Sequence, residues 1–64
     1  MITSQMIVLD IVEKHPETET VFREYDPITG ICILCYHLFD SIETIEKAYD
    51  LNSDEFVERL NGAI

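Results

Sequence analysis

The sequence predicts an all-α fold, a compact bundle of four to five short helices that forms a single domain over residues 1–64. Glycine and proline occur only twice each, which favours long regular elements over a turn-rich all-β chain. Apolar residues recur at helical spacing in most segments, and helix-start signatures lie between these segments. Because 47% of the residues are hydrophobic, the chain has enough apolar surface for a core, which argues against disorder.

The first helix is predicted over residues 6–15. Val8, Ile11 and Val12 recur at helical spacing, although their β-branched side chains also suit a strand. Pro16 ends this helix because the residue before a proline is pushed out of the α region. The same proline can open a second helix, where its missing N–H costs nothing. The second helix is expected to bury one stripe of residues, Thr18, Val21, Phe22 and Tyr25.

A turn is predicted at residues 26–30. Asp26 and Pro27 match the first two positions of a type I turn. An apolar block follows over residues 32–39 and is interrupted only by His37. We expect this block to form a short helix, into which the turn delivers the chain.

Two capping signatures predict the last two helices. Asp40 and Glu43 have the spacing of a capping box, and so do Asn52 and Glu55. Gly62 is expected at the closing cap. The predicted inward residues are Ile42, Ile45, Ala48, Tyr49, Phe56, Val57 and Leu60. The aromatic residues assigned to the core are Phe22, Tyr25, Phe39, Tyr49 and Phe56. The predicted solvent-facing residues are Glu43, Glu46 and Lys47, with Glu43 and Lys47 as an ion pair.

The charge of the chain excludes several classes of partner. Thirteen acidic and four basic residues give a net charge of −9, which disfavours nucleic acid and anionic membranes. A basic protein partner is compatible with this charge, although acids also simply keep a small protein soluble. No segment reaches the roughly 20 apolar residues of a membrane span, and residues 1–5 lack the cationic region of a secretory signal. We therefore expect a cytoplasmic protein, in which disulfides are usually catalytic or sensing.

The two cysteines, Cys32 and Cys35, are the candidate redox pair. Three positions apart on a helix, their sulfurs share one face and can form a disulfide or bind one metal. A position at the helix N-terminus would lower the pKa of Cys32 and make it the attacking thiol. Cys35, one turn deeper and more shielded, would be the resolving thiol. Asp26 and Asp40 oppose the shift, because negative charge disfavours a thiolate.

Other interpretations of these residues stay open. The cysteines could be small core residues. A structural zinc site needs four ligands, and Cys32, Cys35 and His37 supply three, with His15 a distant fourth. Two copies of the chain could pool their cysteines around zinc or an iron–sulfur cluster, so no cofactor is assigned and a metal is not excluded.

The two histidines and two apolar residues after Cys35 also have more than one interpretation. His37 could be a local base or a cation that stabilises a thiolate, or simply a half-exposed histidine. His15 is interpreted as a helix-end histidine. Tyr36 and Leu38 could form an exposed apolar rim for a partner or for a second copy of the chain.

Several short motifs also follow one another in a characteristic order: Ile2-Thr3, Met6, Glu13-Lys14-His15-Pro16-Glu17, Phe22 with Tyr25, Gly30-Ile31-Cys32-x-x-Cys35, Glu43-Thr44-Ile45-Glu46-Lys47-Ala48 and Leu60-Asn61. In this order they resemble the hybrid-cluster-protein-associated redox disulfide domains over nearly the whole chain. The resemblance implies an all-helical domain from bacterial or archaeal, often anaerobic, hosts. It also implies that the C-x-x-C pair, here Cys32 and Cys35, is redox-active.

The sequence thus predicts a small cytoplasmic helical domain whose Cys32–Cys35 dithiol exchanges electrons or disulfides with a protein partner. One alternative is an interaction module, homodimeric or not, with inert cysteines. The other is a metal site shared across a dimer. No acid–base pair, phosphate loop or cofactor pocket is recognisable outside the cysteine segment, so turnover of a small molecule is not predicted and enzymatic activity is left open.

Overall fold

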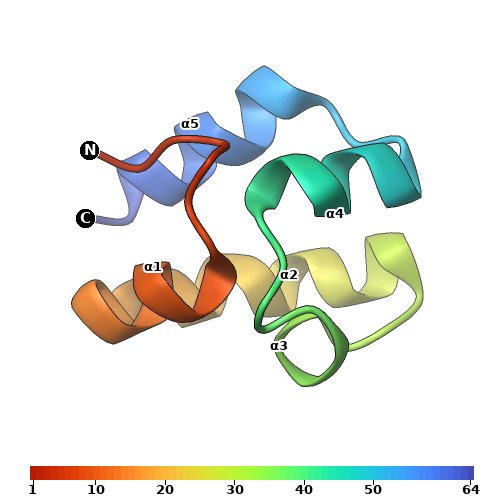
Figure 1. Cartoon of the computed structure of the whole chain (residues 1–64), viewed down its shortest axis with the longest axis horizontal. Coiled ribbons are helices and arrows are strands. Elements are labelled where there is room, and N and C mark those ends of the chain that lie inside the picture. The colour runs from red at the N-terminus through yellow and green to blue at the C-terminus, as the bar shows by residue number, and fades with distance from the viewer.

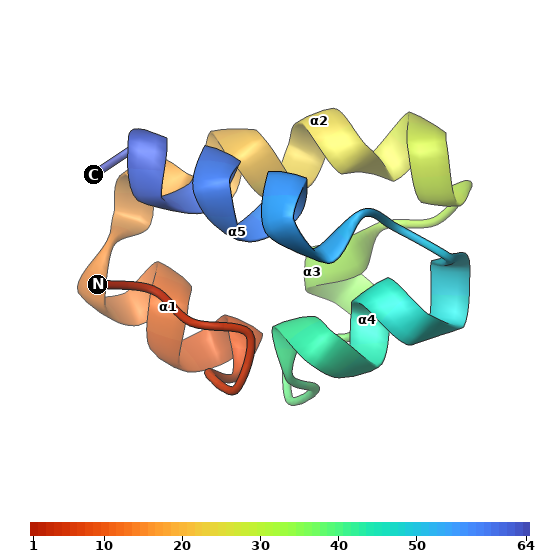
Figure 2. The ribbon, with the colours of Figure 1, turned by 90° about the horizontal axis from the view of Figure 1, so that it is seen from above.

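A computed structural model describes residues 1–64, apart from the side chain of Ser53. Its helices are α1 (Val8–Lys14), the 3-10 helix η1 (Pro16–Thr18), α2 (Glu19–Thr29), α3 (Ile33–Tyr36), α4 (Ile42–Tyr49) and α5 (Ser53–Gly62). They pack into one body of 24 × 22 × 18 Å, in which α5 and α3 lie on opposite sides (Figure 1). Figure 2 shows the same helices from above, with α5 alongside α2. The predicted all-α bundle is confirmed.

Pro16 separates the first two helices, as predicted. Helix α1 ends at Lys14, and Pro16 is the first residue of η1, which leads into α2. The backbone carbonyl of His15 accepts hydrogen bonds from the Thr18 N–H (3.0 Å) and from Thr18 Oγ1 (2.7 Å). These two bonds stabilise the corner at Pro16, which has no N–H to donate to the preceding turn.

The type I turn predicted at residues 26–30 is wrong, because α2 continues through Pro27 to Thr29. Pro27 is exposed and lies in the last turn of the helix, so its ring extends into solvent. The helix ends instead at Gly30, whose positive φ of 81° is accessible to glycine at little cost. The Gly30 N–H donates to the carbonyl of Asp26 (2.8 Å), as in a left-handed C-cap. Burial of the α2 apolar stripe outweighs the cost of one interior proline.

The helix predicted over residues 32–39 is shorter than expected. Helix α3 has four residues, with Cys32 as its N-cap and His37 as its C-cap. Residues 37–41 then form a loop toward α4. The first two N–H groups of α1, from Val8 and Leu9, donate to carbonyls in this loop, those of Asp40 (3.0 Å) and Leu38 (2.8 Å).

The first N–H groups of α4 likewise find acceptors in the segment just before α1. The N–H groups of Ile42 and Glu43 donate to the carbonyls of Met6 (3.1 Å) and Ser4 (2.9 Å). The side-chain cap is Ser41, whose Oγ accepts from Thr44 N–H (3.2 Å). The prediction of Asp40 as the cap is therefore wrong by one residue. The free N–H groups at the start of each helix thus find their acceptors in the segment that precedes the other helix, far away in the sequence.

Helix α5 begins and ends close to the predicted positions. Asn52 Oδ1 accepts from the Glu55 N–H (2.9 Å), which confirms the predicted N-cap. Gly62 is the last helical residue and Ala63 the C-cap. Asn61 side-chain atoms bind both backbone groups of Ile2, at 2.8 and 2.9 Å, and hold the N-terminal segment against α5.

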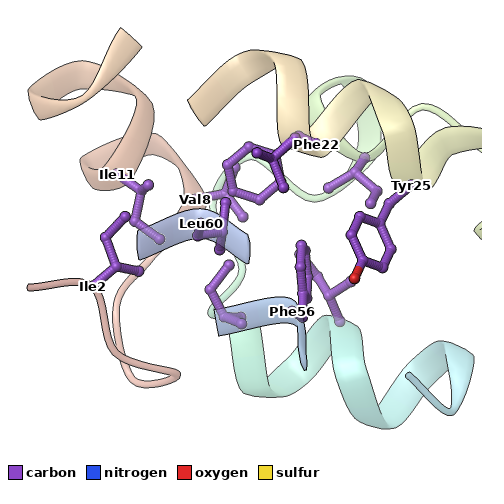
Figure 3. Packing of buried hydrophobic residues seen from close by; sticks show 11 residues of the cluster. Ile2, Val8, Ile11, Phe22, Tyr25, Phe56 and Leu60 are labelled. Atoms are coloured by element: carbon purple, nitrogen blue, oxygen red, sulfur yellow. The ribbon is translucent and has the colours of Figure 1, made fainter. Parts of the chain in front are cut away.

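The core is an apolar cluster centred on Phe56. Its ring lies edge-on to Phe22 (5.8 Å between centroids) and tilted against Tyr25 (4.4 Å), as Figure 3 shows. The buried apolar residues are Ile2, Val8, Ile11, Val21, Phe22, Tyr25, Ile33, Ile42, Ile45, Phe56 and Leu60. Val12, Tyr49 and Val57 pack against this cluster while partly buried.

Three predictions of side-chain burial are wrong. Phe39 is 75% exposed because α3 ends before it. On α4, Ala48 is exposed, whereas Glu46 is buried. The solvent-facing Glu43–Lys47 ion pair is confirmed at 2.8 Å. The hydrogen bond that Lys47 donates to Glu43 lowers the pKa of Glu43 and raises the pKa of Lys47.

Candidate functional site

Cys32 and Cys35 form a disulfide at the start of α3, with their Cα atoms 5.2 Å apart. The predicted proximity of the two sulfurs is confirmed. The backbone already closes this turn, because the Cys35 N–H donates to the Cys32 carbonyl (3.1 Å). The bond therefore joins two residues of one turn and links no separate helices. Its formation or cleavage does not require any helix to move relative to another.

The order of exposure is the reverse of the predicted one. Cys35 is exposed and Cys32 is half-buried. The prediction assumed that Cys35 would lie deeper in a longer helix. With α3 only four residues long, the position after the first turn is already at the surface.

The sulfur of Cys32 occupies the side-chain capping position of α3. Cys32 Sγ accepts a hydrogen bond from the Cys35 N–H at 3.2 Å. Such an N–H donor stabilises negative charge on a sulfur. A four-residue helix has a small dipole, so this local N–H contributes what the sequence interpretation attributed to the whole helix.

Asp26 reaches the same helix start from α2. Its Oδ1 accepts from the Ile33 N–H at 3.1 Å, the amide directly after Cys32. This contact exists because α2 extends past Pro27 and carries Asp26 toward α3. A carboxylate placed next to Cys32 disfavours a second negative charge there. The predicted opposition is thus present for Asp26, whose carboxylate accepts from the Ile33 N–H while the sulfur of Cys32 accepts from the Cys35 N–H. Asp40 contacts His37 instead.

His37 is engaged away from the cysteines. Its Nδ1 lies 2.7 Å from Asp40 Oδ2, and its Nε2 lies 2.7 Å from the Tyr49 hydroxyl. Its ring also stands edge-on to that of Tyr49, at 5.4 Å. Nδ1 therefore braces the loop after α3 internally, and Nε2 holds this loop against α4. The arrangement supports the interpretation of His37 as a half-buried structural histidine and leaves it no contact with either sulfur.

Two large aromatic side chains that follow Cys35 in the sequence are exposed. Tyr36 is 74% exposed and Phe39 75%, whereas Leu38 packs partly against the core. Cys32, Cys35 and Tyr36 are spaced i, i+3, i+4 and share one face of α3, opposite the buried Ile33. Of the two residues predicted to form an exposed apolar rim, Tyr36 is exposed and Leu38 is not, and Phe39 is a further exposed ring.

The metal ligands considered from the sequence do not come together. Among the side chains that the structure describes, no group of three or more His, Cys, Asp and Glu residues is arranged to hold a metal ion. His15 is the C-cap of α1, at the other side of the fold from α3. The two cysteines are bonded to each other.

Sequence reasoning missed the role of Tyr49 at this site and the way in which Asp26, a predicted opposing charge, reaches it. Asp26 was assigned to a turn, and its contact with α3 depends on the unexpected continuation of α2. Tyr49 was assigned to the core, although its hydroxyl holds His37. The only indication of these two contacts in the sequence was that Asp26 and Tyr49 each carry a polar atom on or beside an apolar stripe.

Over the described part of the chain, no helix is long and apolar enough to cross a membrane. Comparison with known proteins finds no match for this chain among family models, curated proteins or solved structures.

Proposed function

We propose that this protein is a redox module whose Cys32–Cys35 pair exchanges thiol and disulfide with a protein partner. The observation that carries the proposal is a disulfide with one exposed sulfur-bearing residue, Cys35, on a turn that the backbone holds independently. A disulfide built for stability usually joins distant segments. A loop this short contributes about 2 kcal/mol or less by restricting the unfolded chain.

The exposure of Cys35 selects the order of bond changes. A partner thiolate attacks Cys35 Sγ, the Cys32–Cys35 bond breaks, and Cys32 leaves with the bonding electron pair. The Cys35 N–H already donates to Cys32 Sγ and stabilises the departing thiolate. The product is a mixed disulfide between the partner and Cys35.

A second thiolate of the partner completes the exchange. It attacks the partner sulfur of the mixed disulfide and releases Cys35 as a thiolate. The partner's two thiols become one disulfide and lose two electrons, which the domain gains. Two protons pass through solvent from the partner thiols to Cys32 and Cys35. The reverse sequence, with Cys35 as the attacking thiolate and Cys32 as the resolving thiolate, oxidises the domain.

We also propose that the chain is a divergent hybrid-cluster-protein-associated redox disulfide domain that acts in the cytoplasm of a bacterium or archaeon. The order of its short motifs supports the family, and the C-x-x-C pair in a helical fold is compatible with it. We propose a protein partner because Cys35 is exposed and the exposed ring of Tyr36 directly follows it.

The test is the reaction of the reduced domain with bis(2-hydroxyethyl) disulfide, a neutral small disulfide. We expect each reduced domain to release two equivalents of mercaptoethanol and to end with its own disulfide closed, as mass spectrometry and thiol titration would show. A variant with both Cys32→Ser and Cys35→Ser controls for side reactions. A domain that does not react, or that stops as the mixed disulfide, would overturn the proposal.

A further inference from the structure

The sequence on either side of the disulfide carries acids and exposed aromatic residues but no lysine or arginine. No Lys or Arg occurs between Arg23 and Lys47, a stretch with five acidic residues. Two of them are next to α3, with Asp26 on the Ile33 amide and Asp40 on His37. A reactive disulfide in such a setting favours positively charged thiols and repels negative ones.

The four cations of the chain are engaged or located elsewhere. Arg23 donates from Nε to Glu19 (3.0 Å), one turn further from α3, and Lys47 pairs with Glu43 at 2.8 Å. Arg59, on α5, lies over the Tyr25 ring at 5.6 Å. Lys14 is the last residue of α1, and Figure 1 shows this helix running away from α3 toward its C-terminal end. None of the four offsets the acids beside α3.

We propose that the face formed by Cys32, Cys35 and Tyr36, extended by Phe39, docks a cysteine-bearing protein segment that is both basic and apolar. The inference rests on the redox function proposed above and specifies its partner. The apolar component follows from the exposed ring of Tyr36 (74%), which directly follows Cys35, and from that of Phe39 (75%), four residues further along the chain. The basic component follows from charge complementarity with the surrounding acids.

Charge also argues against a second copy of the chain as the occupant. Each copy has a net charge of −9, and face-to-face contact would bring together two surfaces bearing Asp26 and Asp40 with no intervening cation. Like charges placed opposite each other in an interface oppose association. The face therefore suits a partner of opposite charge.

The test compares blocked tetrapeptide thiols as reductants of the Cys32–Cys35 disulfide. The sequences are Lys-Cys-Leu-Lys, Ser-Cys-Leu-Ser and Glu-Cys-Leu-Glu, and each rate is divided by that of the same peptide with bis(2-hydroxyethyl) disulfide. This ratio removes differences in intrinsic thiol reactivity. We expect the lysine peptide to exceed the glutamate peptide by about tenfold or more at low salt. The advantage should mostly disappear at about 1 M salt, where screening acts within about 3 Å.

Matched variants locate the effect. Asp26→Asn with Asp40→Asn keeps acceptor oxygens for Ile33 and His37 but removes two charges next to α3. Asp54→Asn with Glu58→Gln removes two exposed charges from α5. We expect the first pair to reduce the lysine preference at least threefold and the second pair to leave it nearly unchanged. Equal effects of the two pairs would show that only net charge matters and would overturn the docking surface.

The aromatic component has its own matched control. Tyr36→Ser with Phe39→Ser should remove the advantage of Lys-Cys-Leu-Lys over Lys-Cys-Ser-Lys, whereas Ile64→Ser, at another exposed apolar residue, should not. Circular dichroism verifies that each variant keeps its helices. Equal normalised rates for all peptide charges would refute this inference and leave the redox function standing. No reaction with any thiol would refute both, and sedimentation showing a dimer through this face would favour a second copy instead.

Discussion

At the scale of single residues, the proposed exchange depends on which of the two cysteines is exposed. The types and spacing of Cys32 and Cys35 were enough to predict a pair that can close a disulfide. Their relative exposure was not predictable, because it depends on α3 ending at Tyr36. The residues that end it, His37 and its partner Tyr49, are twelve positions apart in sequence. A contact of that range leaves no periodic signal in the chain.

Single-cysteine variants test the proposed roles of the two sulfurs. With Cys32→Ser, the exposed Cys35 remains and should collect a mixed disulfide with a protein or peptide disulfide, because no resolving thiol is left. With Cys35→Ser, only the half-buried Cys32 remains, and we expect several-fold slower capture. Mass spectrometry of the captured species over time provides the comparison. Faster capture by Cys32 would restore the order of attack that the sequence suggested.

Tyr25 gives a prediction about alkaline pH. Burial raises the pKa of its phenol above the ordinary 10.0, and the nearby Arg59 guanidinium only partly opposes this shift. The folded protein thus holds the phenol proton more tightly than the unfolded chain does. Its contribution to stability is complete below pH 10 and is lost as pH rises through the folded-state pKa. Urea unfolding at about pH 8 and about pH 11 should show a larger loss for wild type than for Tyr25→Phe. An equal loss would mean that the buried phenol is not the cause.

At the scale of helices, the sequence predicted each element but not all of its boundaries. Local signals worked where local contacts decide, as with Pro16 and the Asn52 cap. They failed where tertiary contacts decide. Packing of the α2 stripe carries that helix through Pro27. The first N–H groups of α1 and of α4 donate to carbonyls in the segment that precedes the other helix, and no short sequence pattern encodes such contacts.

Substitution of Pro27 tests the continuation of α2 directly. Pro27→Ala restores an N–H that can donate to the Arg23 carbonyl and removes the ring's clash with that carbonyl. We expect the free energy of unfolding to rise by about 1 kcal/mol, even though the unfolded chain gains some freedom. Reversible urea unfolding would measure this change. A fall in stability would instead indicate that Pro27 acts as a turn residue, as the sequence suggested.

At the scale of the whole molecule, the fold is held by its apolar core and the disulfide is an addition at its surface. The core gathers residues from the N-terminal segment and from every α-helix of the described chain, with Phe56 between Phe22 and Tyr25 (Figure 3). Helical periodicity predicted most of these residues. It missed Ile2, since its burial depends on Asn61 binding the N-terminal segment to α5. Under the proposed redox function, such a core would keep the shape of the domain in both redox states.

Two phenylalanines make a matched test of this core. Phe56→Ala should cost about 3–5 kcal/mol, because it removes a fully buried ring and leaves a cavity. That loss is comparable to the total stability of a small domain, so much of the variant should be unfolded. Phe39→Ala removes the same atoms from a 75% exposed site and should change stability by about 0.5 kcal/mol or less. Similar losses from the two would place Phe39 in the core after all.

The central claim is that the Cys32–Cys35 pair cycles between dithiol and disulfide on an unchanged helical scaffold. Equilibration of the protein in glutathione buffers, with thiol counting and circular dichroism on the same samples, tests it most directly. We predict a single two-electron transition within the cellular range, between about −180 and −320 mV, and constant helix content across it. A pair that stays reduced, or stays oxidised, throughout that range would contradict the claim. So would a loss of helices on reduction, which would make the disulfide a structural element.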